Sequence, residues 1–156
     1  MNITCISIGK TKEQEYVKFI EFYTKKLNHY NTFQYVELPA LKNANKLSQD
    51  KLKQEEGELI LKKIKGNGQI ILLDEKGKNH SSKEFATYIN KKMISGGQDI
   101  YFIIGGAFGF SDSMYQKSND KMALSKMTFT HQMVRVIFLE QLYRAFSIIK
   151  GEKYHH

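Results

Sequence analysis

The stretch from residue 130 to residue 150 constrains the fold of this chain more than any other feature. The sequence predicts a helix there, beginning at Thr130 and ending near Lys150, and apolar on nearly every side. Such a helix must be enclosed all round. One sheet in a chain of 156 residues can cover only one of its faces. The other face therefore indicates a partner subunit or a threaded environment. Its apolar residues are Val134, Val136, Ile137, Phe138, Leu139, Leu142, Tyr143, Ala145, Phe146, Ile148 and Ile149.

The rest of the chain alternates between predicted strands and helices. Two short, continuous apolar runs, 69–74 and 99–104, are typical of central strands that are buried on both faces. Strands alternating with helices indicate an α/β fold with a mainly parallel sheet, and the length favours a single domain over residues 1–156. The other predicted elements are strands at 2–8, 32–38 and 121–125, and helices at 12–28, 48–66, 81–94 and after Ser111.

The charge of the chain favours an acidic partner. The formal net charge is +8, spread along the whole sequence, so nucleic acid would meet a folded surface instead of a basic tail. A lysine-rich proteome would give the same excess. Only two of the 24 basic residues are arginines, Arg135 and Arg144, and both lie in the last predicted helix. This placement suggests a need for the planar guanidinium at that helix.

Cysteine usage and hydropathy restrict the class of protein. The single cysteine, Cys5, excludes an intramolecular disulfide and any cysteine-clustered zinc site, so we expect a reduced, cytoplasmic protein. The first residues resemble a strand more than a signal peptide, because no basic segment precedes the apolar stretch. No uncharged apolar run is long enough to span a membrane.

A glycine-rich turn, Gly105 to Gly109, directly follows the second buried strand. Glycines at such a place let a ligand approach the backbone closely. The spacing is neither the dinucleotide-binding fingerprint nor a Walker A loop. A glycine-rich turn without any ligand is the alternative.

The start and end of the last helix carry further polar candidates. His131 lies at the helix start, where it is either a structural hydrogen-bonding group or a base. Glu140 and Arg144 are spaced as an ion pair that could simply support the helix. The tail after Gly151 is either a frayed end or part of a site.

Taken together, these segments resemble the RlmH family, the small SPOUT-class ribosomal RNA methyltransferases. The resemblance runs over the whole chain, in length and in order. The residues that carry it are Leu72 to Gly77, Ile103 to Gly106, Ser125 to Phe129, His131 to Val136, Glu140 to Phe146 and Gly151 to His155.

The resemblance implies a fold, a reaction and a set of ligand contacts. The implied fold is a homodimeric α/β domain with a deep trefoil knot formed by roughly residues 70–150. The implied reaction is methylation of N3 of a pseudouridine in the helix 69 loop of 23S ribosomal RNA by S-adenosylmethionine, which needs no metal. The residues expected to hold this cofactor are Leu73, Gly105, Leu124, Ser125, Lys126, Met127, Thr128 and Phe129.

The reaction also needs groups that remove the proton from N3 of the target base. The candidates by location are His131, Tyr154 and His155, while Arg135 and Arg144 are candidates for contacting phosphate or the developing uracil anion. We expect the tail to reach the cofactor site of the partner subunit.

Two other functions remain open from the residues alone. One is a non-enzymatic ribosome- or RNA-binding protein of the same fold. The other is a nucleotide-binding α/β protein that acts on small molecules, although the missing fingerprint and Walker loop count against it.

Overall fold

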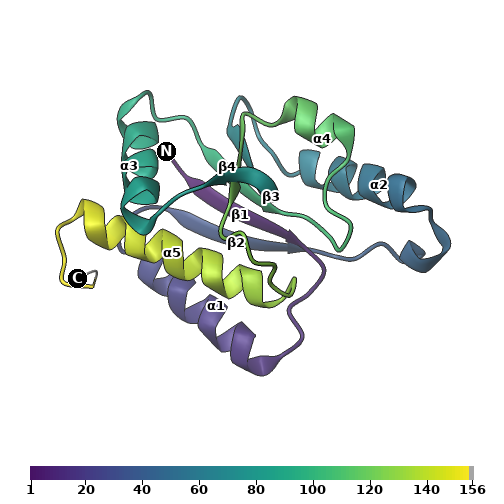
Figure 1. Cartoon of the computed structure of the whole chain (residues 1–156), viewed down its shortest axis with the longest axis horizontal. Coiled ribbons are helices and arrows are strands. Elements are labelled where there is room, and N and C mark those ends of the chain that lie inside the picture. The colour runs from purple at the N-terminus through teal and green to yellow at the C-terminus, as the bar shows by residue number, and fades with distance from the viewer. Residues whose placement is uncertain (155–156) are drawn as a thin grey trace.

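A computed structural model describes residues 1–154, whose strands form one sheet in the order β2-β1-β4-β3-β5 (Figure 1). Every pairing between neighbouring strands is parallel, which confirms the predicted α/β class with a mainly parallel sheet. The strands are β1 (Ile3–Ile8), β2 (Phe33–Leu38), β3 (Gln69–Asn79), β4 (Ile100–Ile104) and β5 (Asp120–Ala123).

Helices cover both faces of the sheet (Figure 1). One face carries α1 (Gln14–Leu27), α3 (Ser82–Ile94) and α5 (Met133–Ile149), and the other carries α2 (Gln49–Leu61) and α4 (Asp112–Lys117). Each layer has its own apolar core, and β4, which is buried along its whole length, contributes side chains to both. This burial confirms that 99–104 contains a central strand.

Serine side chains fix the starts of three helices where the sequence predicted them. The Ser81 side chain accepts a hydrogen bond from the Glu84 backbone, and the Glu84 carboxylate accepts one from the Ser81 backbone, which is a complete capping box. Ser48 and Ser111 cap α2 and α4 in the same way, with one bond each. Between β2 and α2 the chain forms a short 3-10 helix, Ala44–Lys46.

Strand β3 is longer than predicted, because the chain continues in extended form past residue 74. Its pairing with β5 shifts between Leu73 and Lys78, both of which face Met122. A Cβ atom at Gly77 would lie 2.4 Å from the Met122 nitrogen. Glycine is therefore required where β3 bends over β5, and this bend positions the chain that follows Met122.

The last helix is enclosed mainly by its own chain. Helix α5 packs against α1 and α3, and Leu142 is completely buried in their shared core. The uncovered part of α5 is narrower than its composition suggested. Met133 is 36% exposed, and Val136 and Ile137 are partly buried.

Arg135 fastens the start of α5 to the carboxyl ends of β1 and β2. Its side chain is fully buried and donates hydrogen bonds to the carbonyl oxygens of Ile8 (2.8 Å) and Gly9 (3.0 Å). It also donates to Thr11 Oγ1 at 2.9 Å and to the Glu37 carboxylate at 3.2 Å. A buried cation of this kind is tolerated because carboxylate and carbonyl oxygens surround it.

We expect Arg135→Met to destabilise the fold strongly, because the carboxylate and two carbonyl oxygens would lose their donor. Breaking one side of a buried ion pair typically costs about 3–5 kcal/mol of unfolding free energy. Urea denaturation measures this loss. The control is Lys150→Met at the exposed end of α5, for which we expect a change within about 0.5 kcal/mol. Equal stabilities of the two variants would contradict the role given to Arg135.

We also expect Gly77→Ala to lower stability by more than about 1 kcal/mol, because the added methyl group would overlap the Met122 backbone. The neighbouring Lys78→Ala, at an exposed position of the same strand, is the control and should be nearly neutral. Thermal or urea unfolding compares the two. A neutral Gly77→Ala would show that β3 does not depend on this close approach.

Candidate active site

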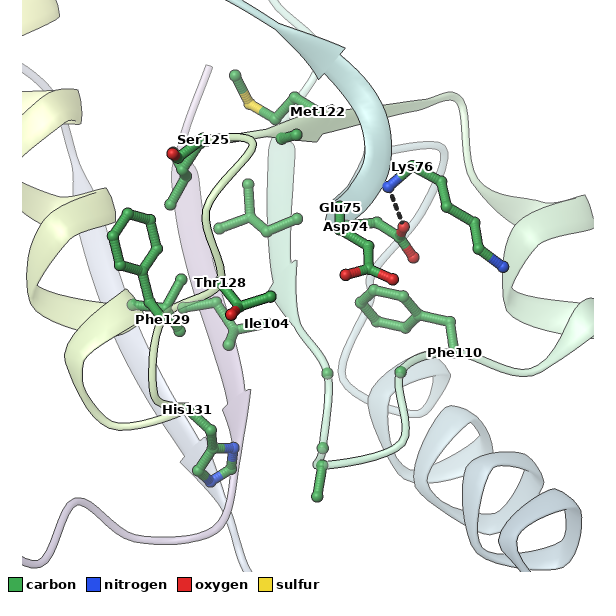
Figure 2. A pocket seen from close by; sticks show the side chains of 18 of the residues that line it. Asp74, Glu75, Lys76, Ile104, Phe110, Met122, Ser125, Thr128, Phe129 and His131 are labelled. Carbon is green, nitrogen blue, oxygen red and sulfur yellow. Dashed lines mark hydrogen bonds between the residues drawn. The ribbon is translucent and has the colours of Figure 1, made fainter.

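A cavity of about 420 Å³ lies beside the carboxyl ends of β4 and β5 and the bend of β3 (Figure 2). In open parallel sheets, ligands bind at this edge. Three segments that are far apart in the sequence form most of its wall: 73–76, 104–110 and 122–129, joined by Tyr115, His131 and Val134. Its size falls within the range of about 300–1,000 Å³ that is usual for small-molecule sites.

All eight residues that the resemblance assigned to the cofactor line this one cavity. Leu73 comes from β3, Gly105 follows β4, and the run from Leu124 to Phe129 connects β5 to α5. The structure thus brings together residues that are more than fifty positions apart. Their contact with a cofactor stays a prediction.

The glycines of the turn leave room for side chains of the protein, whereas the sequence suggested room for a ligand. A Cβ atom at Gly105 would point at the Phe110 ring, 3.0 Å from its Cε1 atom, and not into open ligand space. A Cβ atom at Gly106 would lie 2.5 Å from a carboxylate oxygen of Glu56, a residue of α2. Burial raises the pKa of this glutamate. The two glycines therefore let the turn pack closely on the side chains of Phe110 and Glu56.

One end of the cavity is polar and is formed by Asp74, Glu75 and Lys76. Asp74 accepts hydrogen bonds from the Tyr115 hydroxyl and from the Lys76 backbone, the latter at 2.7 Å. Glu75 and Lys76 also line the cavity beside Asp74 (Figure 2). In a sequence, two acids and a lysine after a strand look the same as an exposed turn, and here the bend at Gly77 brings them into the site.

The loop between β5 and α5 forms the opposite wall of the cavity. Ser125 Oγ accepts a hydrogen bond from the Met127 nitrogen at 2.9 Å, which makes a tight turn. Thr128 and Phe129 lie on the cavity side of this loop (Figure 2). The cavity thus combines apolar side chains with polar groups, a combination that suits a small organic ligand carrying both.

His131 lies at the edge of this cavity with its ring fixed by Arg135. The Nη2 atom of Arg135 is 3.2 Å from His131 Nε2, and a guanidinium can only donate, so Nε2 is an acceptor. Burial and the charge of Arg135 lower the pKa of His131. The ring is therefore neutral, with its hydrogen on Nδ1. This arrangement argues against His131 as the base, since its only lone pair is already engaged.

Arg135 itself is an unsuitable contact for RNA in this structure. Its donors are used by β1, β2 and His131, and its side chain has no exposed surface. The prediction that Arg135 contacts phosphate or uracil gives way to a role in holding other groups in place. The planar guanidinium that the sequence suggested is needed here to bind carbonyl oxygens of the protein itself.

Arg144 and Tyr154 meet at the other end of α5, away from the cavity. The Arg144 Nε atom donates to Glu140 Oε1 at 3.0 Å, and the Tyr154 hydroxyl donates to the same oxygen at 3.1 Å. The guanidinium carbon lies 4.7 Å from the centre of the Tyr154 ring. None of the three lines the cavity. Glu140, seen in the sequence only as helix support, holds this cluster together.

The described part of the tail folds back onto its own helix. The Glu152 nitrogen donates to the Ser147 carbonyl at 2.9 Å, and the Glu152 carboxylate accepts from the Tyr30 hydroxyl. Tyr154 packs edge-on against Tyr143, with ring centres 4.7 Å apart. Burial raises the pKa of Tyr154, so its hydroxyl is a donor at neutral pH. The predicted candidate His155 lies outside the described residues.

Among residues 1–154, no group of three or more His, Cys, Asp or Glu side chains is placed to hold a metal ion. Within the same residues, no helix is both long and apolar enough to cross a membrane.

Comparison with known proteins agrees with the fold and the length of the chain. Residues 1–155 match the family described as "Predicted SPOUT methyltransferase". The chain is 53% identical over 156 residues to Ribosomal RNA large subunit methyltransferase H of Cytophaga hutchinsonii, with all of both chains covered. It is 49% identical to the protein of the same name from Flavobacterium johnsoniae, over all of this chain and 99% of the relative.

The fold also has a counterpart among solved structures. A probable methylase family protein from Haemophilus influenzae Rd KW20 matches 99% of this chain and 70% of that chain, with a TM-score of 0.54 and 13% identity. At this identity the likeness concerns the fold alone. The matches over the full length, by contrast, show that the chain belongs to the SPOUT methyltransferase family, in the RlmH group.

Proposed function

We propose that this protein transfers a methyl group from S-adenosylmethionine to N3 of a pseudouridine in the helix 69 loop of 23S ribosomal RNA. One observation carries the proposal. The three segments that the RlmH resemblance assigns to the cofactor, far apart in the sequence, converge on a single cavity. Relatives named as large-subunit ribosomal RNA methyltransferases match the chain from end to end.

The cavity fits S-adenosylmethionine in volume and in chemistry. Its apolar side chains suit an adenine ring, and its polar residues suit the ribose and the amino-acid tail. When bound, this cofactor supplies a methyl group already activated by the sulfonium. The protein then has to orient the two reactants and exclude water. Leu73 and Phe129 both supply apolar wall to the cavity. Thr128 lies next to Phe129 on the cavity side of the loop (Figure 2).

The position of the second cluster supports a site built from two subunits. Arg144 lies ten residues beyond Val134 on α5, about 15 Å along the helix axis. One chain therefore does not bring Arg144 and Tyr154 to its own cavity. A second copy packed antiparallel on α5 would place its Arg144 end beside the cavity of the first. The partly exposed Met133, Val136 and Ile137 are available for this contact.

In this arrangement each group has a defined task. Arg144, held by Glu140, supplies the positive charge that stabilises the uracil anion as the N3 proton leaves. The Tyr154 hydroxyl donates its hydrogen to Glu140 and so helps to hold the Glu140–Arg144 pair in place. His155 stays a candidate for the base that removes the proton. The net charge of +8 draws the dimer to ribosomal RNA in the cytoplasm, and the dimer surface reads that RNA by shape.

We also propose that the cofactor site lies within a trefoil knot formed by roughly residues 70–150 of a single domain covering 1–156. The support is that every segment lining the cavity falls inside that range.

A methyl-transfer assay tests the proposed function. Purified protein and labelled S-adenosylmethionine are mixed with 70S ribosomes, and the labelled nucleoside is identified by mass spectrometry. We expect label on one pseudouridine of helix 69 and none on ribosomes whose helix 69 carries uridine at that position. A protein that binds ribosomes but transfers no methyl group would support the non-enzymatic alternative instead.

The α5 interface predicts how single substitutions change the oligomeric state. Ile137→Asp should give a folded monomer, because a charge would enter the shared apolar face. Leu142→Asp is unsuitable, since Leu142 is fully buried within one chain. The matched control is Ile94→Asp, at a residue that is 76% exposed on α3. Light scattering measures the mass of each, and a dimeric Ile137→Asp would contradict the interface.

Mixed dimers test whether the two clusters act across subunits. One subunit carries Thr128→Trp, which fills the cavity, and the other lacks residues 153–156. We expect each homodimer to lose at least about 100-fold in methyl transfer. The mixed dimer should recover up to half of the wild-type activity per dimer, because one intact cavity faces one intact tail. A mixed dimer as inactive as both parents would show that each chain uses its own tail.

A further inference from the structure

We infer that His131 donates its Nδ1 hydrogen to the carboxylate of the amino-acid tail of bound S-adenosylmethionine, with Arg135 as the residue that positions the ring. This inference rests on the proposed function and adds a specific contact to it. The sequence left His131 as either a structural hydrogen-bonding group or a base, and the geometry assigns it the role of a hydrogen-bond donor.

The hydrogen of the neutral His131 ring lies on Nδ1, because Nε2 accepts a hydrogen bond from Arg135. Arg135 Nη2 donates to His131 Nε2 at 3.2 Å, and Arg135 Nε donates to the His131 carbonyl oxygen at 3.2 Å. The guanidinium is held in turn by Ile8, Gly9 and Glu37. Because it cannot move freely or accept a hydrogen bond, it fixes both the tautomer and the orientation of the imidazole.

The other ring nitrogen, Nδ1, lacks an acceptor within the described part of the chain. His131 Nδ1 is buried and has no hydrogen-bond partner among the described residues. A buried donor without an acceptor is costly, so such groups in native proteins usually await a ligand, a water molecule or an ion. His131 and Val134 both line the cavity, and His131 lies at its edge (Figure 2). A ligand in the cavity can therefore supply the missing acceptor.

The groups around His131 favour an acceptor with a negative charge. The positive end of the α5 dipole lies next to His131 and favours an anion. Arg135 adds a buried positive charge that Glu37 offsets in part, and Lys126 also lines the cavity. The only anionic group of S-adenosylmethionine is its carboxylate. An RNA phosphate carries the same charge, but His131 lines the cavity that we assign to the cofactor.

Pairs of ligands separate this contact from a general effect on the pocket. S-adenosylhomocysteine carries the amino-acid tail, whereas 5′-methylthioadenosine lacks it but keeps the adenosine. By titration calorimetry, His131→Gln should bind S-adenosylhomocysteine about 10- to 100-fold more weakly, the loss typical of a hydrogen bond to a charged group. Its affinity for 5′-methylthioadenosine should stay within about twofold of the wild-type value, because that ligand never made the bond.

A second substitution tests which ring nitrogen matters. The amide of Gln reaches the place of Nε2, whereas that of Asn reaches the place of Nδ1. His131→Asn should therefore keep most of the affinity for S-adenosylhomocysteine that His131→Gln loses. In the wild type, 15N spectra of the imidazole should show the hydrogen on Nδ1. Its signal should shift with S-adenosylhomocysteine but not with 5′-methylthioadenosine.

Several outcomes would overturn the inference. Equal losses for both ligands would make His131 a part of the pocket wall only. Unchanged affinity for both, with slower methyl transfer to ribosomes, would move its contact to the RNA. Hydrogen on Nε2 in the spectra would refute the tautomer. If neither ligand bound the wild type, the proposed function itself would fail, which is a separate result.

Discussion

The buried guanidinium of Arg135 is the interaction on which the arrangement of the site depends. It joins the carboxyl ends of β1 and β2 to the first turn of α5, although these segments are more than ninety residues apart in the sequence. The loop 124–132 leads into that turn and forms one wall of the cavity. A cation buried this completely is stable only because carbonyl and carboxylate oxygens meet it on several sides. Arg135 also orients the ring of His131, so the same side chain stabilises the fold and positions a residue of the cavity.

Much of the fold could be predicted because its signals are local. The apolar runs at 69–74 and 99–104 gave the buried strands, and Ser81 with Glu84 marked the start of α3 through a capping box. The alternation of strands and helices indicated the parallel sheet. Leu73, Gly105 and the run 124–129 were assigned to the cofactor by family resemblance, because the turn at Gly105 matched no general nucleotide-binding motif.

What the sequence did not reveal depends on contacts between distant segments. The continuation of β3 past Asp74 requires the close approach of Gly77 to Met122, and no local pattern records that pairing. Arg135 looked like an RNA contact because its acceptors, mostly carbonyl oxygens, are invisible in a sequence. The all-round apolar character of α5 suggested a wide interface, whereas α1 and α3 already cover much of it.

The two ends of α5 carry two different sets of groups. One end borders the cavity through His131 and Val134, and the other holds Arg144 and Tyr154 around Glu140. Because the helix keeps these sets apart, we propose that methyl transfer needs both subunits of a dimer. The helix then serves as the contact between the subunits and as the spacer that sets where each subunit's groups lie.

The most direct test of this account is mass mapping of modified nucleosides in 23S ribosomal RNA from cells that lack the protein. We predict that the methyl group on N3 of one helix 69 pseudouridine disappears, while the other modifications of that loop remain. The wild-type gene should restore it, and a gene carrying the cavity-filling Thr128→Trp should not. Unchanged methylation at that nucleotide in the deletion strain would contradict the account.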